Sequence, residues 1–200
     1  MMGTQTKMQE EPNSSKMTLE QYFEMEYRSP FRHEYMDGQA QRMAYTSENH
    51  GTLVSKLNRL IGNCLLNKAC RVYASDRMVY VPGAECNNIY YPDLVIACDP
   101  VQRYQYSKNM VATMNPSIII EVLSDSTENE DRHDKWQCYR KILSLKQYIL
   151  VSQKHKFIQI INRTEKSSHW LVDEFEHADE IISILDCQFS LREVYAKVEI

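Results

Sequence analysis

Glu121 is the residue whose sequence surroundings point most directly to chemistry. It interrupts residues 116–124, an apolar run rich in β-branched side chains that predicts a buried strand. A lone carboxylate there is costly unless a partner such as a metal ion compensates its charge. A second carboxylate, Asp93, follows Pro92 at the start of another apolar strand. We therefore predict that Asp93 and Glu121 meet in one polar site.

Carboxylates and water are the usual ligands of Mg²⁺ and Mn²⁺, which take further ligands from substrate phosphate. Lys135 lies on a predicted helix, four residues from both Asp131 and Tyr139, so the three side chains share a face. If this helix packs beside the Glu121 strand, the ammonium group can stabilise negative charge or orient a nucleophilic water. A plain surface ion pair between Lys135 and Asp131 is equally compatible with the spacing.

Other residues have both structural and chemical interpretations. Glu121 could form a buried pair with Arg77 instead of binding a metal. Glu34 could cap polar groups of a hairpin, and His50 fits a capping or packing role near a helix start. Tyr104 could stack on nucleic-acid bases or belong to a protein interface. The sequence leaves these alternatives open.

The predicted elements are those of a mixed α/β (α+β) protein. A capping box at Thr18 opens a short helix, Asp37-Gly38 indicates a hairpin within residues 32–44, and apolar spacing predicts a helix over 47–67. The remaining expectations are a strand over 71–81 bent near 75–76, strands at 93–98 and 116–124, a loop over 99–115, a helix over 127–143, strands at 147–152, 156–163, 168–175 and 181–185, and a final helix over 191–197. This order favours a mixed sheet with flanking helices. We expect a loose tail over 1–17 and a single domain over 18–200.

Together, these segments resemble a known family. The ordered set H-E-Y-M-D-G, S-E-N-H, Y-Y-P-D, E-V-L-S-x-S-T and D-x-x-x-K-x-x-x-Y is similar to the Uma-type family of predicted bacterial endonucleases, within the restriction-endonuclease-like PD-(D/E)XK superfamily. The similarity extends from about Tyr22 to Tyr148. It implies a restriction-endonuclease-like mixed β-sheet core flanked by helices, and a Mg²⁺-dependent phosphodiesterase site.

The resemblance assigns roles by matching position. Asp93 and Glu121 would be the catalytic, metal-binding acids, and Glu34 would add a metal or water contact. Leu123 stands where the superfamily has lysine, which points to Lys135 as a migrated third catalytic residue. Asp125 replaces a frequent proline of the family.

Composition limits the alternatives. The hydrophobic share is 43%, the charged share 25%, and the net charge −4, which speaks against strong non-specific nucleic-acid binding but permits a local basic face. No apolar window reaches the length of a membrane span, and residues 1–16 do not fit a signal peptide. Six scattered cysteines without a C-x-x-C pair predict reduced thiols in a cytoplasmic protein.

We therefore predict a Mg²⁺-dependent endonuclease, with Mn²⁺ as a substitute ion, DNA as the favoured partner and a homodimer as a plausible assembly. The alternative is a catalytically inactive module of the same fold that binds nucleic acid or a protein. A serine or cysteine hydrolase has little support, since no G-x-S-x-G motif is present.

Overall fold

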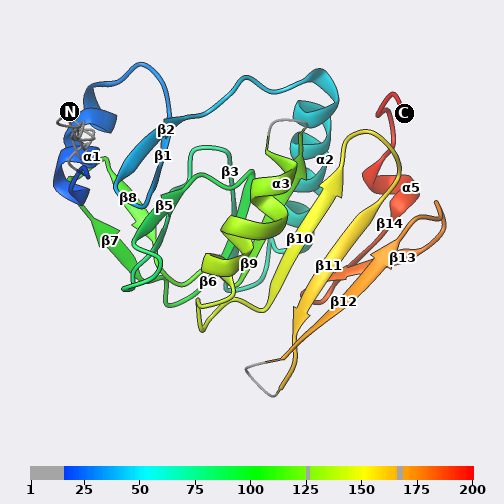
Figure 1. Ribbon diagram of the computed structural model, residues 1–200. Coiled ribbons are helices and arrows are strands. Elements are labelled where there is room, and N and C mark those ends of the chain that lie inside the picture. The colour runs from blue at the N-terminus through cyan, green and yellow to red at the C-terminus, as the bar shows by residue number, and fades with distance from the viewer. Residues whose placement is uncertain (1–15, 125–126, 166–168) are drawn as a thin grey trace, which may run out of the picture.

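The structure, a computed structural model, describes residues 16–124, 127–165 and 169–200 (Figure 1). Within these ranges the strands form two six-stranded sheets and one two-stranded hairpin. The first sheet contains, in spatial order, β2 (Gln39–Arg42), β1 (His33–Met36), β5 (Asn88–Tyr90), β4 (Val79–Val81), β8 (Val111–Thr113) and β7 (Arg103–Gln105). The second, here called the central sheet, contains β12 (Trp170–Phe175), β11 (Ile158–Arg163), β10 (Gln147–Ser152), β9 (Ile118–Leu123), β6 (Leu94–Cys98) and β3 (Cys70–Ala74).

Helices cover both faces of the central sheet (Figure 1). One face packs against α2 (Glu48–Cys64), α5 (Leu191–Val194) and the hairpin of β13 (Ile181–Ile184) with β14 (Cys187–Ser190). The opposite face packs against a helical segment made of α3 (Glu128–Glu130), the π-helix η1 (Asp131–Lys135) and α4 (Trp136–Tyr139). The predicted fold class, a mixed sheet flanked by helices, is confirmed.

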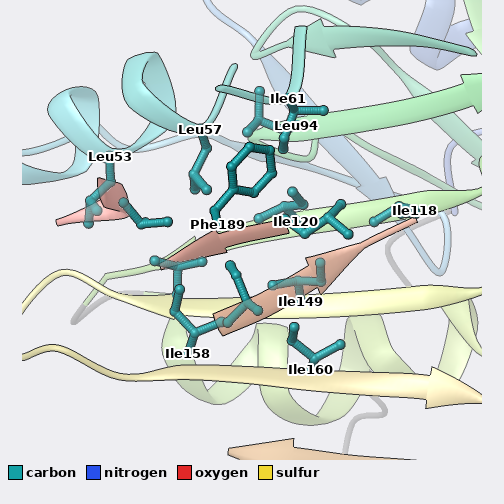
Figure 2. Close-up of a cluster of buried hydrophobic side chains, with 14 of the residues drawn as sticks. Leu53, Leu57, Ile61, Leu94, Ile118, Ile120, Ile149, Ile158, Ile160 and Phe189 are labelled. Atoms are coloured by element: carbon teal, nitrogen blue, oxygen red, sulfur yellow. The ribbon is translucent and has the colours of Figure 1, made fainter. Parts of the chain in front are cut away.

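Alternating side chains explain the two layers. Ile118, Ile120 and Val122 of β9 join the cluster beneath α2, which Figure 2 shows between the helix and the sheet. Ile119 and Leu123 point the other way, into the cluster under α4. Because successive strand residues face opposite sides, Glu121 lies on the same side as Ile119 and Leu123.

The local signals at the chain start are confirmed. Helix α1 (Leu19–Arg28) begins with a complete capping box between Thr18 and Gln21. Strands β1 and β2 pair around Asp37 (φ 51°) and Gly38 (φ 86°), as an Asp-Gly hairpin requires. The expected tail falls mainly on residues outside the described ranges, but Met17 donates its N–H to the Gly38 carbonyl at 2.8 Å.

Two local expectations were wrong. The strand predicted over 71–81 divides at Ser75 (φ 52°) into β3 and β4, which belong to different sheets. The loop predicted over 99–115 contains the β7–β8 hairpin, where Tyr104 packs its ring on Phe23 with centroids 5.5 Å apart. At the start of the helix predicted over 127–143, Thr127 makes no side-chain capping bond within the described residues, and its hydroxyl lies 2.9 Å from that of Ser124.

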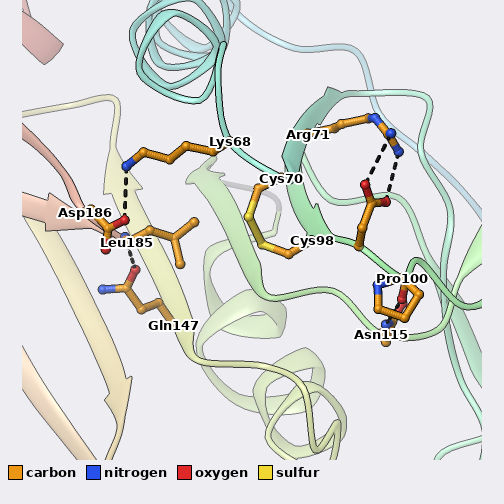
Figure 3. Close-up of a disulfide and its surroundings, with 10 residues drawn as sticks. Lys68, Cys70, Arg71, Cys98, Pro100, Asn115, Gln147, Leu185 and Asp186 are labelled. Carbon is orange, nitrogen blue, oxygen red and sulfur yellow. Dashed lines mark hydrogen bonds and ion pairs between the residues drawn. A yellow bond between two sulfur atoms is a disulfide. The ribbon is translucent and has the colours of Figure 1, made fainter.

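The cysteine prediction was also wrong, because all six cysteines are paired. The pairs are Cys64–Cys187, Cys70–Cys98 and Cys86–Cys138. Figure 3 shows Cys70–Cys98, which joins directly opposed residues of β3 and β6. The partners are 123, 28 and 52 residues apart in sequence, so only the tertiary fold brings them together.

Candidate active site

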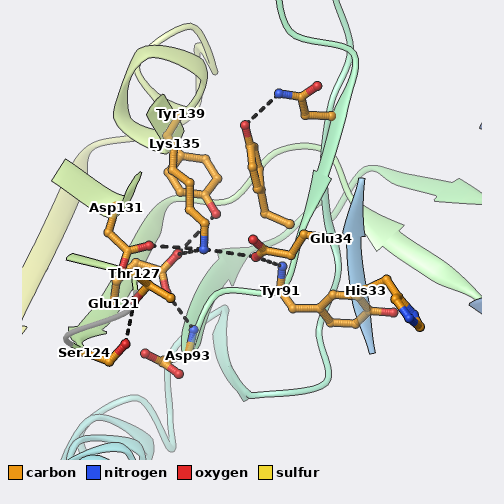
Figure 4. A network of polar contacts seen from close by, with 12 residues as sticks. His33, Glu34, Tyr91, Asp93, Glu121, Ser124, Thr127, Asp131, Lys135 and Tyr139 are labelled. Carbon is orange, nitrogen blue, oxygen red and sulfur yellow. Dashed lines mark hydrogen bonds and ion pairs between the residues drawn. The ribbon is translucent and has the colours of Figure 1, made fainter. Parts of the chain in front are cut away.

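The two predicted acids meet at the ends of neighbouring strands. Strands β6 and β9 are antiparallel with Leu94 opposite Ile120, so Asp93 comes opposite Glu121. The Asp93 N–H donates to Glu121 Oε2 at 3.1 Å, and the Val122 N–H donates to Asp93 Oδ2 at 2.7 Å. Each acid is thus held by the backbone beside the other, and Figure 4 shows the bond from the Asp93 N–H to Glu121.

Glu121 is a buried carboxyl, with only 3% of its surface exposed. Burial raises its pKa well above the ordinary value; Lys135 opposes this, while the nearby charges of Asp131, Asp93 and Glu34 add to it. The Tyr139 hydroxyl donates to Glu121 Oε1 at 3.3 Å. Negatively charged side chains therefore surround Glu121, whose ionised form is already destabilised by burial.

Lys135 reaches this site from the helical segment, as the sequence predicted it could (Figure 4). Its Nζ lies 3.1 Å from Glu34 Oε1, 3.1 Å from Asp131 Oδ1 and 3.9 Å from Glu121 Oε1. Burial lowers the pKa of this ammonium group, but the three carboxylates outweigh it and hold the pKa well above its ordinary value. Lys135 is a buried cation, so the alternative of a surface ion pair was wrong.

Leu123 is a packing residue. It is buried in the core cluster under α4, on the face of β9 that also carries Glu121. The position two residues after Glu121 is thus occupied by an apolar core side chain. The ammonium group of Lys135 comes instead from η1, in the helical segment that packs against this face of the sheet.

The helical segment has a π-helical turn where it carries these groups. Asp131 and Lys135 are the first and last residues of η1, and the Asp131 carbonyl accepts a hydrogen bond from the Tyr148 hydroxyl at 2.9 Å. Such π-helical turns occur frequently at functional sites. Here, the turn places Asp131 and Lys135 side by side against β9.

Glu34 comes from β1 in the other sheet. Its Oε1 accepts the Tyr91 N–H at 3.0 Å in addition to the ion pair with Lys135. Glu34 therefore lies in the site with Lys135, and among the described residues it does not cap the polar groups of its own hairpin. The Arg77 alternative was wrong, since the Arg77 guanidinium donates to Thr113 Oγ1 at 2.7 Å.

His50 is the residue whose role the sequence did not reveal. It lies in the first turn of α2, is 6% exposed, and its Nε2 is 3.1 Å from Asp93 Oδ2. Its position near a helix start supported only capping or packing. The contact depends on the docking of α2 onto the end of β6, which no short motif encodes.

These groups line a cavity of ≈ 130 Å³. Its walls include Glu34, His50, Asp93, Glu121, Glu130, Asp131 and Lys135. Five carboxyl groups and one ammonium group thus line the cavity. Glu130 adds to this excess, since its buried Oε1 has no hydrogen-bond partner among the described residues.

An oxygen-rich, acidic cavity of this kind suits a hard cation such as Mg²⁺. Within the described residues, no three His, Cys, Asp or Glu side chains already form a complete metal-binding group. Mg²⁺ nevertheless commonly uses one or two carboxylates with water and substrate phosphate. Asp93 and Glu121 meet that requirement.

Comparison with known proteins identifies the family. A family model named Uma2 and described as "Putative restriction endonuclease" matches residues 19–192. The chain belongs to the Uma2 family. This confirms the resemblance seen in the sequence.

Two relatives from Synechocystis sp. (strain PCC 6803) match most of the chain. The uncharacterised protein slr1290 is 29% identical over 181 residues, which is 90% of this chain and 92% of that protein. The uncharacterised protein sll1609 is 30% identical over 161 residues, covering 79% and 86% respectively.

A solved structure shares the fold. The crystal structure of a "putative nuclease belonging to DUF820" from Anabaena variabilis superposes with a TM-score of 0.69 at 13% sequence identity. The match covers 90% of this chain and 98% of that protein. No helix among the residues described here has the length and apolar character needed to span a membrane.

Proposed function

We propose that this Uma2 protein is a metal-dependent endonuclease that hydrolyses phosphodiester bonds, with DNA as its substrate. The observation that carries the proposal is the convergence of Asp93 and Glu121 on neighbouring strands, beside Lys135, in an acidic cavity. Family membership supports the same reaction class.

In this proposal Asp93 and Glu121 hold Mg²⁺, with Mn²⁺ as a substitute, and Glu34 adds a contact to the ion or its water. The bound ion would supply a water of lowered pKa and positive charge near the phosphate. Lys135 would be the third catalytic group, stabilising the negative charge that develops on the phosphate oxygens. Its pairs with Glu34 and Asp131 fix the ammonium group in place before substrate binds.

The direct test is a cleavage assay with plasmid and single-stranded DNA in millimolar Mg²⁺ or Mn²⁺. Because metal coordination contributes several kcal/mol to the transition state, Asp93→Asn and Glu121→Gln should each lower the rate more than about a hundredfold. Glu24→Gln removes an exposed carboxylate of α1 and should retain the wild-type rate. Full cleavage by both site variants would contradict the proposal.

Assay conditions should keep the cysteines paired. Disulfides persist in oxidising compartments and are rare in reducing ones. The assay should therefore preserve the three pairs, and the cytoplasmic location expected from the sequence stays a prediction. Cleavage should be measured without reductant.

A second candidate is an inactive module of the same fold, binding nucleic acid or a partner protein. It is favoured by the internal partners of the acids, since Glu121 Oε2 accepts from Asp93 and Oε1 from Tyr139. Thermal unfolding with and without Mn²⁺ separates the two candidates. A functional site should raise the melting temperature in an Asp93-dependent manner, whereas an inactive site should leave it unchanged.

Subunit assembly belongs to the proposal as well. A homodimer would allow a nuclease to address both strands of a duplex through two-fold symmetry. Sedimentation at micromolar concentration should show a dimer, and a monomer throughout the range would remove this part of the proposal.

A further inference from the structure

We infer that His50 is a positioning residue that orients Asp93 for metal binding. This inference rests on the proposed function, because it assumes that Asp93 is a ligand. Its basis is a part-buried contact at hydrogen-bond distance: His50 Nε2 lies 3.1 Å from Asp93 Oδ2, and the two side chains are 8% and 18% exposed. An ionised carboxylate only accepts, so Nε2 carries the hydrogen of this bond.

The contacts to Asp93 are unevenly distributed over its two oxygens. Oδ2 accepts from both His50 and the Val122 N–H, which lies at 2.7 Å. Both hydrogen bonds therefore hold the Asp93 carboxylate through Oδ2. Oδ1 receives no hydrogen bond in the described part of the chain and is the oxygen left for a cation.

The first turn of α2 is itself tied to the end of β9. Ser47 Oγ accepts the His50 N–H at 3.1 Å and also bonds Gln153 Oε1. Gln153 Nε2 then donates to the Leu123 carbonyl at 2.9 Å, two residues beyond Glu121. The His50 backbone is thus linked through Ser47 and Gln153 to Leu123, which lies on the same strand as Glu121.

A further pair of bonds secures this turn. Asn49 Nδ2 donates to the Glu199 carbonyl at 3.0 Å, and the Glu199 N–H donates to Asn49 Oδ1 at 3.2 Å. Ser47 and Asn49, which both precede His50 in the chain, are therefore held in place. A side chain that served only to fill the core would not require its donor atom to face a carboxylate in the acidic cavity.

The test is Mn²⁺ binding to the intact, oxidised chain, measured by titration calorimetry and by the Mn²⁺ electron paramagnetic resonance signal. Outer-shell partners of metal ligands typically change affinity by about 10- to 100-fold. His50→Leu should weaken Mn²⁺ binding by about that factor. His50→Gln, whose amide nitrogen can donate in place of Nε2, should restore affinity to within a few-fold of the wild type. His177→Leu alters an exposed histidine outside the site and should bind Mn²⁺ as the wild type does.

The outcomes are distinguishable. Wild-type affinity in folded His50→Leu overturns the inference, and so does an equal loss in the Leu and Gln variants, which would make the imidazole itself a ligand. Asp93→Asn serves as the reference and should abolish binding. If Asp93→Asn binds Mn²⁺ normally, the metal site of the proposed function fails, and the inference fails with it. Thermal unfolding of each metal-free variant verifies folding.

Discussion

Lys135 is a buried cation held between carboxylates from three elements. Glu34 comes from β1, Glu121 from β9, and Asp131 from the same helical segment as Lys135. Removing one partner of a buried ion pair leaves the other charges uncompensated, which costs far more than loss of an exposed pair. The ammonium group therefore joins the two sheets in addition to its proposed catalytic role.

Lys135→Met should lower the free energy of unfolding by about 3–5 kcal/mol, because Glu34 and Asp131 lose their cation. Urea denaturation measures this value. Lys68→Met is the matched control, since Lys68 pairs with Asp186 at the surface and its loss should cost less than about 1 kcal/mol. Equal losses in the two variants would contradict a structural role for the buried pairs.

Glu121→Gln should have opposite effects on stability and on metal response. The neutral amide removes a buried carboxylate that lies among like charges, so the metal-free variant should melt at a higher temperature than the wild type. The same change should abolish the Mn²⁺-induced rise in melting temperature. Differential scanning calorimetry with and without Mn²⁺ checks both effects; a lower melting temperature without metal would count against the charge argument.

At the residue scale, the sequence predicted that Asp93, Glu121 and Lys135 belong to the site. It did not predict which other side chains contact them. Asp93 and Glu121 could be paired because Glu121 interrupts one apolar strand pattern and Asp93 stands at the start of another. Lys135 followed from its helical spacing with Asp131. His50 could not be assigned, since its contact with Asp93 spans 43 residues and depends on how α2 docks.

The β1–β2 hairpin is the element that delivers Glu34 to the site. Its register places Glu34 opposite Gln41 and is set by the turn at Asp37 and Gly38. A slip by one residue would turn Glu34 to the other face of the sheet. The conformation of the Asp37-Gly38 turn therefore decides whether the Glu34 side chain reaches the site.

Gly38→Ala should destabilise the protein by at least about 1–2 kcal/mol. Gly38 has φ 86°, which is strained for a residue with a Cβ, and that Cβ would lie 2.6 Å from Lys16 Cβ. Gly51→Ala is the contrasting control: Gly51 is helical with no heavy atom within 4 Å of an added Cβ, so alanine should stabilise by about 0.5–1 kcal/mol. Chemical denaturation of both variants checks the signs, and a neutral Gly38→Ala would argue against a strained turn.

Elements with strong local signals were predictable. Helix α2 follows its apolar spacing, and the Asp-Gly pair fixes the first hairpin. The β7–β8 hairpin was missed because its strands are three residues each, too short to show periodicity. The change of sheet at Ser75 was missed because tertiary pairing decides it.

Three disulfides connect distant parts of the molecule. Cys64–Cys187 ties α2 to β14, Cys70–Cys98 joins β3 to β6, and Cys86–Cys138 joins the loop before β5 to α4. Cys138 adjoins Tyr139, whose hydroxyl donates to Glu121. Cross-links of this kind stabilise the fold mainly by restricting the unfolded chain.

Replacing Cys64 and Cys187 together by alanine should cost about 4–5 kcal/mol, as expected for a cross-link between residues 123 apart. The same change at Cys70 and Cys98, which are 28 apart, should cost about 3–4 kcal/mol. Guanidinium unfolding without reductant measures both. A thiol titration of the denatured, unreduced wild type should find no free thiol; six free thiols would contradict the paired state.

The central claim is that Asp93 and Glu121 together bind a divalent cation. The most direct measurement is anomalous X-ray diffraction from crystals of the oxidised protein soaked in Mn²⁺. The account predicts one strong anomalous peak within coordination distance of both carboxylates, which is absent from crystals of Glu121→Gln. A well-ordered wild-type site without such a peak, or a peak that persists unchanged in Glu121→Gln, would contradict it.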